Sequence, residues 1–278
     1  MYELMNGKEV AEKIKAQVKA EIEDRYLDPR LAVVVVGNDP ASKIYVNNKK
    51  KACEQVGIES LECCFKEDVT EDVLIQFIHE LNENPCVSGI LVQLPLPKHL
   101  DEKKILEHID PAKDVDCFTS INTGKLWLGD YELAPCTALG VLELLDHYNI
   151  DIAGKHCVIV GRSNIVGKPM AALMLERNAT VTICHSKTKN LSDITRKADI
   201  LIVAVGKPKF LTWGMVKDGA VVVDVGINRD EDGKLCGDVD FKGVSDRASY
   251  LTPTPGGTGP MTVAMLMKNT LIAAKNLI

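Results

Sequence analysis

The chain has 278 residues, enough for about two domains of the usual size, each with its own hydrophobic core. Apolar residues make up 46% of the sequence and charged residues 26%, which is typical of folded globular proteins and excludes disordered and collagen-like chains. The net charge of -6 argues against an extended surface for nucleic acid, so no nucleic-acid partner is expected.

Membrane, secretory and metal-binding signals are missing from the sequence. No stretch approaches the roughly 18 consecutive apolar residues of a membrane span, and the first residues lack the apolar core of a signal peptide. No membrane association and a cytoplasmic location are therefore expected. The nine cysteines are scattered, without a C-x-x-C pair, as is typical of reduced and mostly buried thiols. The six histidines are dispersed, so no metal site is predicted.

The first part of the chain alternates between helical and strand patterns. Apolar residues at every fourth position predict an amphipathic helix over residues 10–22, and an uninterrupted Val-rich run predicts a buried strand over 31–36. Further elements follow by the same criteria: a helix over 42–55, a strand over 58–65, a helix over 70–81 and a strand over 87–94. This alternation indicates βαβ units and a mostly parallel sheet.

Between residues 95 and 135 the pattern weakens. Apart from a short helix over 101–108, this stretch is polar with scattered Pro and Gly, as expected for an interdomain region. After a helix over 137–148 the alternation resumes, which indicates a second α/β unit. Its predicted elements are strands at 156–160, 180–184, 200–205 and 220–225, a helix over 168–177 and an apolar helix from Met261.

A glycine-containing turn follows the strand predicted at 156–160. Gly161 and Gly167 bracket this turn and a helix comes next, which is the order of a Rossmann unit. Such a turn lets a pyrophosphate approach the backbone, and the helix N-terminus offers free N–H groups. Ser163 stands where the G-x-G-x-x-G pattern has its second glycine. The alternative is a tight turn in an α/β protein that binds no nucleotide.

The end of the next predicted strand bears on the kind of dinucleotide. An NAD site usually has an Asp or Glu there for the ribose 2'-hydroxyl, whereas this sequence has Cys184-His-Ser-Lys. Ser186 can donate a hydrogen bond to a 2'-phosphate, and Arg162 can donate charge-assisted bonds. NADP is therefore favoured over NAD, unless Arg162 and Lys187 are solvated surface cations.

Tyr45 and Lys49 lie one turn apart in the helix predicted over 42–55, so the phenol and the ammonium share a face. A desolvated Lys can lose its proton near neutral pH and act in acid–base catalysis. Gln93 and Pro95 lie at the carboxyl end of a predicted strand, where open α/β sheets bind ligands. The alternative is an exposed Tyr and Lys pair on the helix surface.

Two more segments contain residue types suited to ligand binding. Asp114 and Asp116 share one face of an extended segment, where they can bind an amine-bearing heterocycle or cap a turn. Residues 253–260 are dense in Gly and Pro and open the last helix, with Pro260 suited to its first position. Such a segment suits a backbone that runs close to a ligand or between two domains, the alternative being a flexible loop.

Together these motifs resemble the bifunctional methylenetetrahydrofolate dehydrogenase/cyclohydrolase family, in order and over nearly the whole chain. The resemblance is carried by Tyr45-x-x-x-Lys49, Val92-Gln-Leu-Pro-Leu-Pro97, Pro111-x-Lys-Asp-Val-Asp116, Pro135-Cys-Thr137, Gly161-Arg-Ser-x-Ile-Val-Gly-x-Pro169, Cys184-His-Ser-Lys-Thr188 and Thr252-Pro-x-Pro-Gly-Gly-x-Gly-Pro-Met-Thr262. One departure is Cys117, where the family pattern has Gly. If that position has a positive φ, a Cys there is strained.

The resemblance implies two α/β domains that flank a cleft, the second a Rossmann-type domain with a mostly parallel sheet. Residues 1–136 plus 261–278 would form the folate-binding catalytic domain, and residues 137–260 the NADP-binding domain. The family oxidises 5,10-methylenetetrahydrofolate with NADP to 5,10-methenyltetrahydrofolate, which it hydrolyses to 10-formyltetrahydrofolate. NADP as cofactor, tetrahydrofolate one-carbon derivatives as substrates and a homodimer are therefore expected. A dehydrogenase-only relative or a non-catalytic NADP-binding regulator is the alternative.

The resemblance also implies roles for individual residues. Lys49 would be the titratable catalytic group, hydrogen-bonded by Gln93, while Tyr45 orients the folate and Asp116 binds the pterin. These four residues would be both catalytic and substrate-binding, and Asp114 would be structural. The remaining expected contacts are Pro95, Gly256 and Gly257 for the folate, and Gly161, Arg162, Ser163, Ser186 and Ile227 for NADP.

Overall fold

The computed structural model describes residues 2–277, and the chain divides into two compact units. The first-half unit comprises Glu12–Cys136 and Val263–Ile278. The second-half unit comprises Met1–Ala11 and Thr137–Thr262. The chain therefore passes between the units more than once.

Two helices run from one unit into the other, and one short strand places the N-terminal residues in the second-half unit. Helices α1 (Gly7–Asp24) and α10 (Thr258–Asn276) each begin in the second-half unit and end in the first-half unit. Strand β1 (Glu3–Leu4) pairs in parallel with β11 (Tyr250–Leu251). Because of this pairing, the first eleven residues group with the second-half unit, whereas the expected boundary put them in the first domain.

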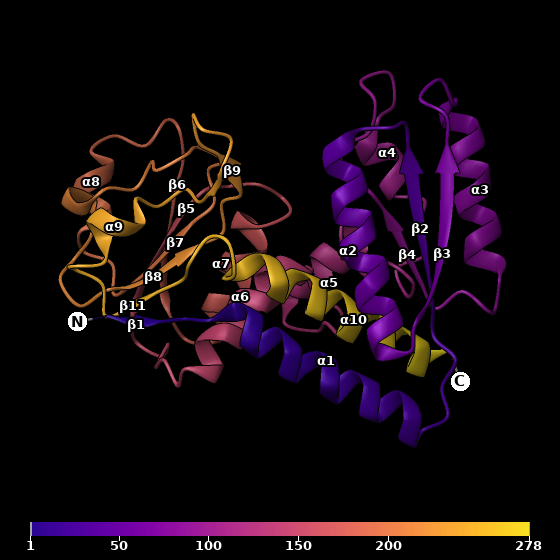
Figure 1. The fold of residues 1–278 in the computed structure, drawn as a ribbon, viewed down its shortest axis with the longest axis horizontal. Helices are drawn as coiled ribbons and strands as arrows, with labels where there is room; N and C mark the ends of the chain where they lie inside the picture. The colour runs from indigo at the N-terminus through magenta and orange to yellow at the C-terminus, as the bar shows by residue number, and fades with distance from the viewer. Residues whose placement is uncertain (1, 278) are drawn as a thin grey trace. The chain divides into compact units, whose positions relative to one another are not determined.

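The first-half unit contains a three-stranded parallel sheet in the order β3-β2-β4. Figure 1 shows helices α2 and α3 alongside these strands. The elements of this unit, besides α1 and α10, are β2 (Arg30–Val36), α2 (Pro40–Val56), β3 (Glu59–Phe65), α3 (Glu71–Glu83), β4 (Gly89–Val92), α4 (Glu102–Leu106) and α5 (Ser120–Leu128).

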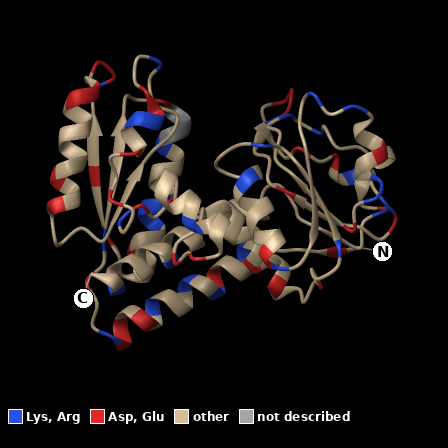
Figure 2. Ribbon diagram, turned by 180° about the vertical axis from the view of Figure 1, so that it is seen from behind, with Lys and Arg blue, Asp and Glu red and all other residues tan. Residues whose placement is uncertain are grey.

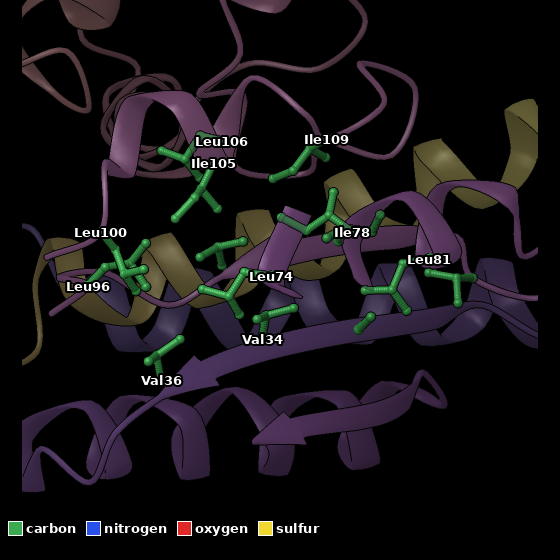
Figure 3. Close-up of a cluster of buried hydrophobic side chains, with 14 residues drawn as sticks. Val34, Val36, Leu74, Ile78, Leu81, Leu96, Leu100, Ile105, Leu106 and Ile109 are labelled. Atoms are coloured by element: carbon green, nitrogen blue, oxygen red, sulfur yellow. The ribbon is translucent and has the colours of Figure 1, made fainter. Parts of the chain in front are cut away.

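A hydrophobic cluster joins one face of this sheet to α3 and α4 (Figure 3). Leu74, Ile78 and Leu81 recur at helical spacing on α3 and are buried against strand residues that include Val34. Ile105 of α4 is fully buried in the same cluster. Burying each such side chain contributes about 1.5–3 kcal/mol, so the apolar stripe on α3 fixes this helix against the sheet.

The second-half unit contains a six-stranded sheet, in which all paired strands are parallel, and a two-stranded antiparallel hairpin. Its elements, besides β1 and β11, are α6 (Cys136–His147), β5 (His156–Val160), α7 (Gly167–Glu176), β6 (Thr180–Cys184), α8 (Leu191–Thr195), β7 (Ile200–Val203), the short 3-10 helix Trp213–Met215, β8 (Val221–Asp224), β9 (Asn228–Arg229), β10 (Leu235–Cys236) and α9 (Phe241–Val244).

The strand order in the six-stranded sheet is β1-β11-β8-β7-β5-β6. From β5 the chain passes to β6 on one side and then crosses to β7 on the other. The order therefore reverses between β5 and β7. In open parallel sheets, ligands bind outside the carboxyl ends of the strands at such a switch point. The loops after β5 and β7 are consequently where a ligand site is expected.

The mostly parallel α/β fold predicted from the sequence is confirmed. Strands β5 and β6 have the predicted bounds, while β4 ends at Val92, two residues before the predicted end. The expected interdomain stretch was wrong, because residues up to Cys136 belong to the first-half unit and include α5. This helix has a weak apolar pattern and depends on local capping, since Thr119 accepts a hydrogen bond from the backbone N–H of Asn122.

Acidic and basic residues are interspersed along the ribbon, as Figure 2 shows for α1, which has both signs along its length. Among residues 2–277, none of the helices combines the length and apolarity of a membrane span. All nine cysteines are free thiols in the structure, and five of them are buried.

Candidate active site

Lys49 and Gln93 form a direct contact in the first-half unit. The Nζ atom of Lys49 donates to Oε1 of Gln93 over 3.0 Å. Gln93 immediately follows β4 and is held there, because its backbone N–H donates to the carbonyl of Val34 and its Nε2 donates to the carbonyl of Leu94. Both partners are half-buried. An amide is a neutral acceptor, so it orients the Lys49 amine without stabilising the ammonium as a carboxylate would.

Asp116 lies in the same neighbourhood, as the surroundings of the buried Cys136 thiol show. Burial raises the pKa of Cys136 well above its usual value, and the nearby Asp116 carboxylate raises it further. The thiol itself donates to the carbonyl of Val115 over 3.3 Å. The positive charge of Lys49 opposes this rise. A carboxylate and an amine from distant parts of the sequence therefore lie near one buried thiol. Tyr45 lies one turn before Lys49 on α2 and is 41% exposed.

Asp114 has a different role from Asp116. Its carboxylate is buried and accepts hydrogen bonds from the backbone N–H groups of Phe118 and Thr119 and from the amide of Asn122. It therefore caps the turn that leads into α5, which confirms the prediction that Asp114 is structural.

Cys117, the departure from the family pattern, has a φ of +58°. This lies in the left-handed region, where a side chain is strained and Gly is not. The buried thiol donates to the carbonyl of Asp114 over 3.4 Å. The chain thus keeps the backbone conformation that suits Gly, with a Cys in its place.

Sequence reasoning missed Asn269, a buried residue of α10. Its Nδ2 donates to the carbonyls of Val115 and Ala134 over 2.8 and 2.9 Å. These carbonyls precede Asp116 and Cys136 by one and two residues, so one amide fixes both segments. The available signal was weak, because Asn269 stands between Lys268 and Thr270 in a helix that is otherwise mostly apolar.

In the second-half unit, the two glycine positions of the turn after β5 have no room for a side chain. A Cβ atom on Gly161, which has a φ of +138°, would lie 2.3 Å from the carbonyl oxygen of Ala204. A Cβ on Gly167 would lie 2.3 Å from the carbonyl oxygen of Gly161. Ser163 caps the entry to α7, since its Oγ accepts from the N–H groups of Val166 and Gly167. The turn is thus pre-formed at the switch point of the sheet.

Arg162 and Ser186 lie on neighbouring strand ends. Val160 and Cys184 are partners in the pairing of β5 with β6, and each of the two candidate residues follows its strand end by two positions. Both side chains are exposed. Ser186 sits in a turn closed by a hydrogen bond from the N–H of His185 to Oγ1 of Thr188. No carboxylate follows β6 directly, so a guanidinium and a hydroxyl are the groups offered to a ligand there.

The remaining candidates fall in two places. Ile227 follows β8, is 45% exposed and lies 3.6 Å from where a Cβ on Gly259 would be. Gly256 has a φ of +105°, and a Cβ on Gly257 would lie 2.5 Å from the carbonyl oxygen of Pro253, so this loop requires glycine. These residues belong to the second-half unit, whereas the exposed Pro95 belongs to the first-half unit.

The fold and these groups define a class of protein: an α/β enzyme with a dinucleotide-type parallel sheet in one unit and an amine held by an amide in the other. Within residues 2–277, no group of three or more His, Cys, Asp or Glu side chains is arranged to hold a metal ion.

Comparison with known proteins identifies the family. A family model described as the tetrahydrofolate dehydrogenase/cyclohydrolase catalytic domain matches residues 5–116, and one described as the NAD(P)-binding domain of the same family matches residues 135–278. The chain belongs to this family. The prediction of a bifunctional dehydrogenase and cyclohydrolase with a nicotinamide dinucleotide cofactor is confirmed, and the non-enzymatic alternative is not supported.

Individual relatives are similar over almost their full length. The chain is 58% identical to the bifunctional protein FolD of Acetivibrio thermocellus over 98% of this chain and 96% of that protein. A crystal structure of the FolD enzyme of Campylobacter jejuni has a TM-score of 0.97 at 51% identity, with complete coverage of both chains. The Trypanosoma brucei enzyme, solved with NADP and an inhibitor, has a TM-score of 0.94 at 38% identity, covering 99% of this chain and 98% of that one.

Proposed function

We propose that the enzyme oxidises 5,10-methylenetetrahydrofolate with NADP and hydrolyses the product, 5,10-methenyltetrahydrofolate, to 10-formyltetrahydrofolate. The observation that carries this proposal is the hydrogen bond from Lys49 to Gln93, which presents a half-buried amine at the carboxyl end of a parallel strand. Family membership supports both activities, and the NADP bound to the Trypanosoma brucei enzyme supports the choice of cofactor.

The dehydrogenase step needs positioning more than acid–base catalysis. The carbon that loses hydride lies between two nitrogens, whose lone pairs stabilise the resulting cation, so no strong base is required. NADP supplies the hydride acceptor when it is bound. Gly161 and Ser163 would hold it at the turn before α7, Arg162 and Ser186 would bind its 2'-phosphate, and Ile227 would contact it after β8. The exposed guanidinium and hydroxyl after β5 and β6 fit an anionic group.

The hydrolysis step needs a titratable group, because water attacks the methenyl carbon and protons must move. Lys49 supplies this group, and Gln93 aims its amine without fixing it in the charged form. Asp116 would bind the donor edge of the pterin, and Tyr45 would pack against the folate and orient it. Pro95, Gly256 and Gly257 would complete the folate contacts.

Replacement of Lys49 tests the assignment. Lys49→Met should lower the rate of 5,10-methenyltetrahydrofolate hydrolysis by about 100-fold or more, the range typical for a lost acid–base group. The rate of NADPH formation from 5,10-methylenetetrahydrofolate should fall less, because that step needs no strong base. The two rates are followed separately, by loss of the methenyl absorbance and by appearance of reduced cofactor.

The neighbouring Lys50 provides a matched control. It is exposed on the same helix and pairs with Glu62, so Lys50→Met should leave both rates at the wild-type level. Hydrolysis by Lys49→Met at the wild-type rate would remove Lys49 from the mechanism. A wild-type enzyme with neither activity would refute the proposed function itself.

The organisation of the protein beyond the site is also a proposal. Residues 1–136 plus 261–278 would act as the folate-binding domain and residues 137–260 as the NADP-binding domain. The family models support the division near residue 136, since they match residues 5–116 and 135–278. We further propose a homodimer in the cytoplasm, since this is the expectation for the family. Light scattering at several protein concentrations tests the dimer.

A further inference from the structure

Two buried carboxylates lie at the carboxyl edge of the second-half sheet and have no part in the chemistry described above. Asp224 is the last residue of β8 and is 3% exposed, and Asp238 follows β10 and is fully buried. Among residues 2–277, neither carboxylate has a Lys or Arg partner in an ion pair. Both charges are instead held by hydrogen-bond donors of the chain, and burial without donors would be costly.

Asp238 collects four donors from two loops. Its Oδ2 accepts from the backbone N–H groups of Val205 and Gly206, over 2.6 and 3.0 Å. Its Oδ1 accepts from the backbone N–H of Lys207 and from Nδ2 of Asn228, both over 2.8 Å. Three consecutive N–H groups after β7 and one side chain after β8 therefore depend on a single carboxylate.

Asp224 holds Asp238 and the start of the second loop. Its Oδ1 accepts from the N–H groups of Gly226 and Asp238, each over 2.9 Å, and its Oδ2 accepts from the N–H of Val239 over 3.0 Å. Together the two carboxylates bind seven donors, of which six are backbone N–H groups. A carboxylate suits this role because it only accepts, whereas an amide would turn a donor toward some of these N–H groups.

The glycines beside this pair leave no room for side chains. A Cβ on Gly226 would lie 2.2 Å from Cγ of Asp238, and a Cβ on Gly237 would lie 1.7 Å from Oδ2 of Asp224. The backbone of Asp224 extends the network, since its N–H donates to Oγ1 of Thr252 and its carbonyl accepts from Oγ1 of Thr258. The pair thus connects the ends of β7 and β8 with the Gly-rich loop before α10.

These segments lie where the second half of a dinucleotide would be placed. Arg162 and Ser186 follow β5 and β6, and the glycine turn of Gly161 packs on Ala204 at the switch point. A dinucleotide whose 2'-phosphate is at β6 and whose pyrophosphate is at the turn after β5 extends across the strand order toward β7 and β8. Segments 205–207 and 225–228 are therefore next along its path.

We propose that Asp238 and Asp224 are positioning residues that hold segments 205–207 and 225–228 in the shape that receives the nicotinamide end of NADP. The proposal rests on the proposed function, because it takes the second-half sheet as the NADP site. Both residues act through the backbone that they fix and neither touches the cofactor in this account. Ile227 illustrates the mechanism, since it lies between Gly226 and Asn228, which the two carboxylates hold separately.

The test is Asp238→Asn, which keeps the size of the side chain and removes one acceptor. We expect the Kd and KM for NADP to rise about tenfold or more, since small displacements of positioning groups have large effects. The cyclohydrolase rate should stay within about twofold of wild type, because Lys49 and its partners belong to the other unit.

Hydrogen exchange of the backbone amides at 205–207 should become faster in the variant. Burial raises the pKa of Asp224 to about 6, so work at about pH 8 keeps it ionised.

Asp199→Asn is the matched control. Asp199 precedes β7 at the opposite end of the strand and also accepts a backbone N–H, from His156 over 2.9 Å, besides pairing with Lys217. The same substitution there should leave the Kd for NADP, both rates and exchange at 205–207 unchanged. If this control weakens NADP binding as much as Asp238→Asn does, the effect is not specific to the carboxyl edge and the proposal fails.

Four results would count against the proposal or against the function on which it rests. Wild-type NADP affinity in Asp238→Asn would overturn the proposal, as would a parallel fall of both activities that follows the folded fraction. If Asp238→Asn does not fold, Asn228→Ala replaces it, since this change removes only one donor to Asp238; an unchanged KM for NADP would then overturn the proposal. A wild-type enzyme that does not bind NADP would refute the proposed function, whereas faster exchange at 205–207 in the variant would still report the carboxylate contact.

Discussion

At the scale of single residues, the site residues that sequence motifs predicted differ in how the structure holds them. Lys49 is oriented by a side-chain hydrogen bond to Gln93, and Asp116 lies near the buried thiol of Cys136. Arg162 instead extends from a turn whose backbone is fixed by Gly161. The structure thus holds the Lys49 side chain by a side-chain contact, whereas the side chain of Arg162 is exposed.

Arg162→Ala should raise the KM for NADP far more than any KM for NAD, because the guanidinium would bind the 2'-phosphate that only NADP carries. Steady-state kinetics with both cofactors give the ratio directly. Lys187→Ala is a suitable comparison, as this residue is an exposed cation in the same region and is not assigned to the phosphate. An unchanged NADP to NAD ratio in Arg162→Ala would remove Arg162 from the proposed phosphate site.

At the scale of elements, Lys113 shows how a charged side chain from another segment can cap the end of a helix. Its side chain is 3% exposed, and its Nζ donates to the carbonyls of Leu81, Asn82 and Asn84 at the end of α3. Burial lowers the pKa of Lys113. The last carbonyls of a helix have no N–H donors within the helix. The Lys113 ammonium supplies hydrogen-bond donors to them.

Lys113→Met should lower the free energy of unfolding by about 2–3 kcal/mol, since it leaves buried carbonyls without donors. Urea unfolding followed by circular dichroism measures the change. Lys104→Met is the control, because Lys104 is exposed and pairs with Glu71 at the other end of α3. This substitution should leave the urea concentration at the unfolding midpoint nearly unchanged. Equal unfolding midpoints for Lys113→Met and Lys104→Met would show that the buried contacts of Lys113 contribute nothing to the free energy of unfolding.

The elements also show where sequence patterns are informative. The four-residue spacing on α1 and α3 and the apolar runs of β2 and β5 predicted those elements, because burial on one face or both leaves a periodic trace. Helix α5 left none, since it contains Gly124 and polar residues and is stabilised by caps from Asp114 and Thr119. Capping contacts between residues a few positions apart are weaker signals than periodicity.

At the scale of the whole molecule, two continuous helices cross from one unit to the other. Unfolding of either unit would unravel the part of α1 and of α10 that the other unit uses, so the units should unfold in one cooperative transition. The two tryptophans allow a test, because Trp127 belongs to the first-half unit and Trp213 to the second-half unit.

NADP at about 100 times its Kd should stabilise the folded protein by roughly 2.7 kcal/mol. In single-tryptophan variants, made by Trp127→Phe or Trp213→Phe, the melting temperature reported by either fluorophore should rise by the same amount. A shift seen only by Trp213 would show that the units unfold independently. The variants without NADP serve as the reference for each fluorophore.

Patterns along the chain were enough to predict the class of fold, the family and most of the candidate residues. Strand and helix periodicity, the glycine turn at Gly161 and the Tyr45 and Lys49 spacing are local properties, and local order along the chain is enough to detect them. The family pattern also marked Cys117 as a departure, and its positive φ explains why Gly suits that position.

Which distant groups meet follows from the folded chain and could not be predicted from its patterns. Several contacts join segments separated by many residues. They are the pairing of β1 with β11, the hydrogen bond from the Asn269 amide to the carbonyl of Val115, and the donors around Asp224 and Asp238. Such contacts follow from strand order and register, and no spacing in the sequence encodes them. Buried polar groups must find partners wherever the fold brings donors, which is why these residues emerge only when the chain is seen folded.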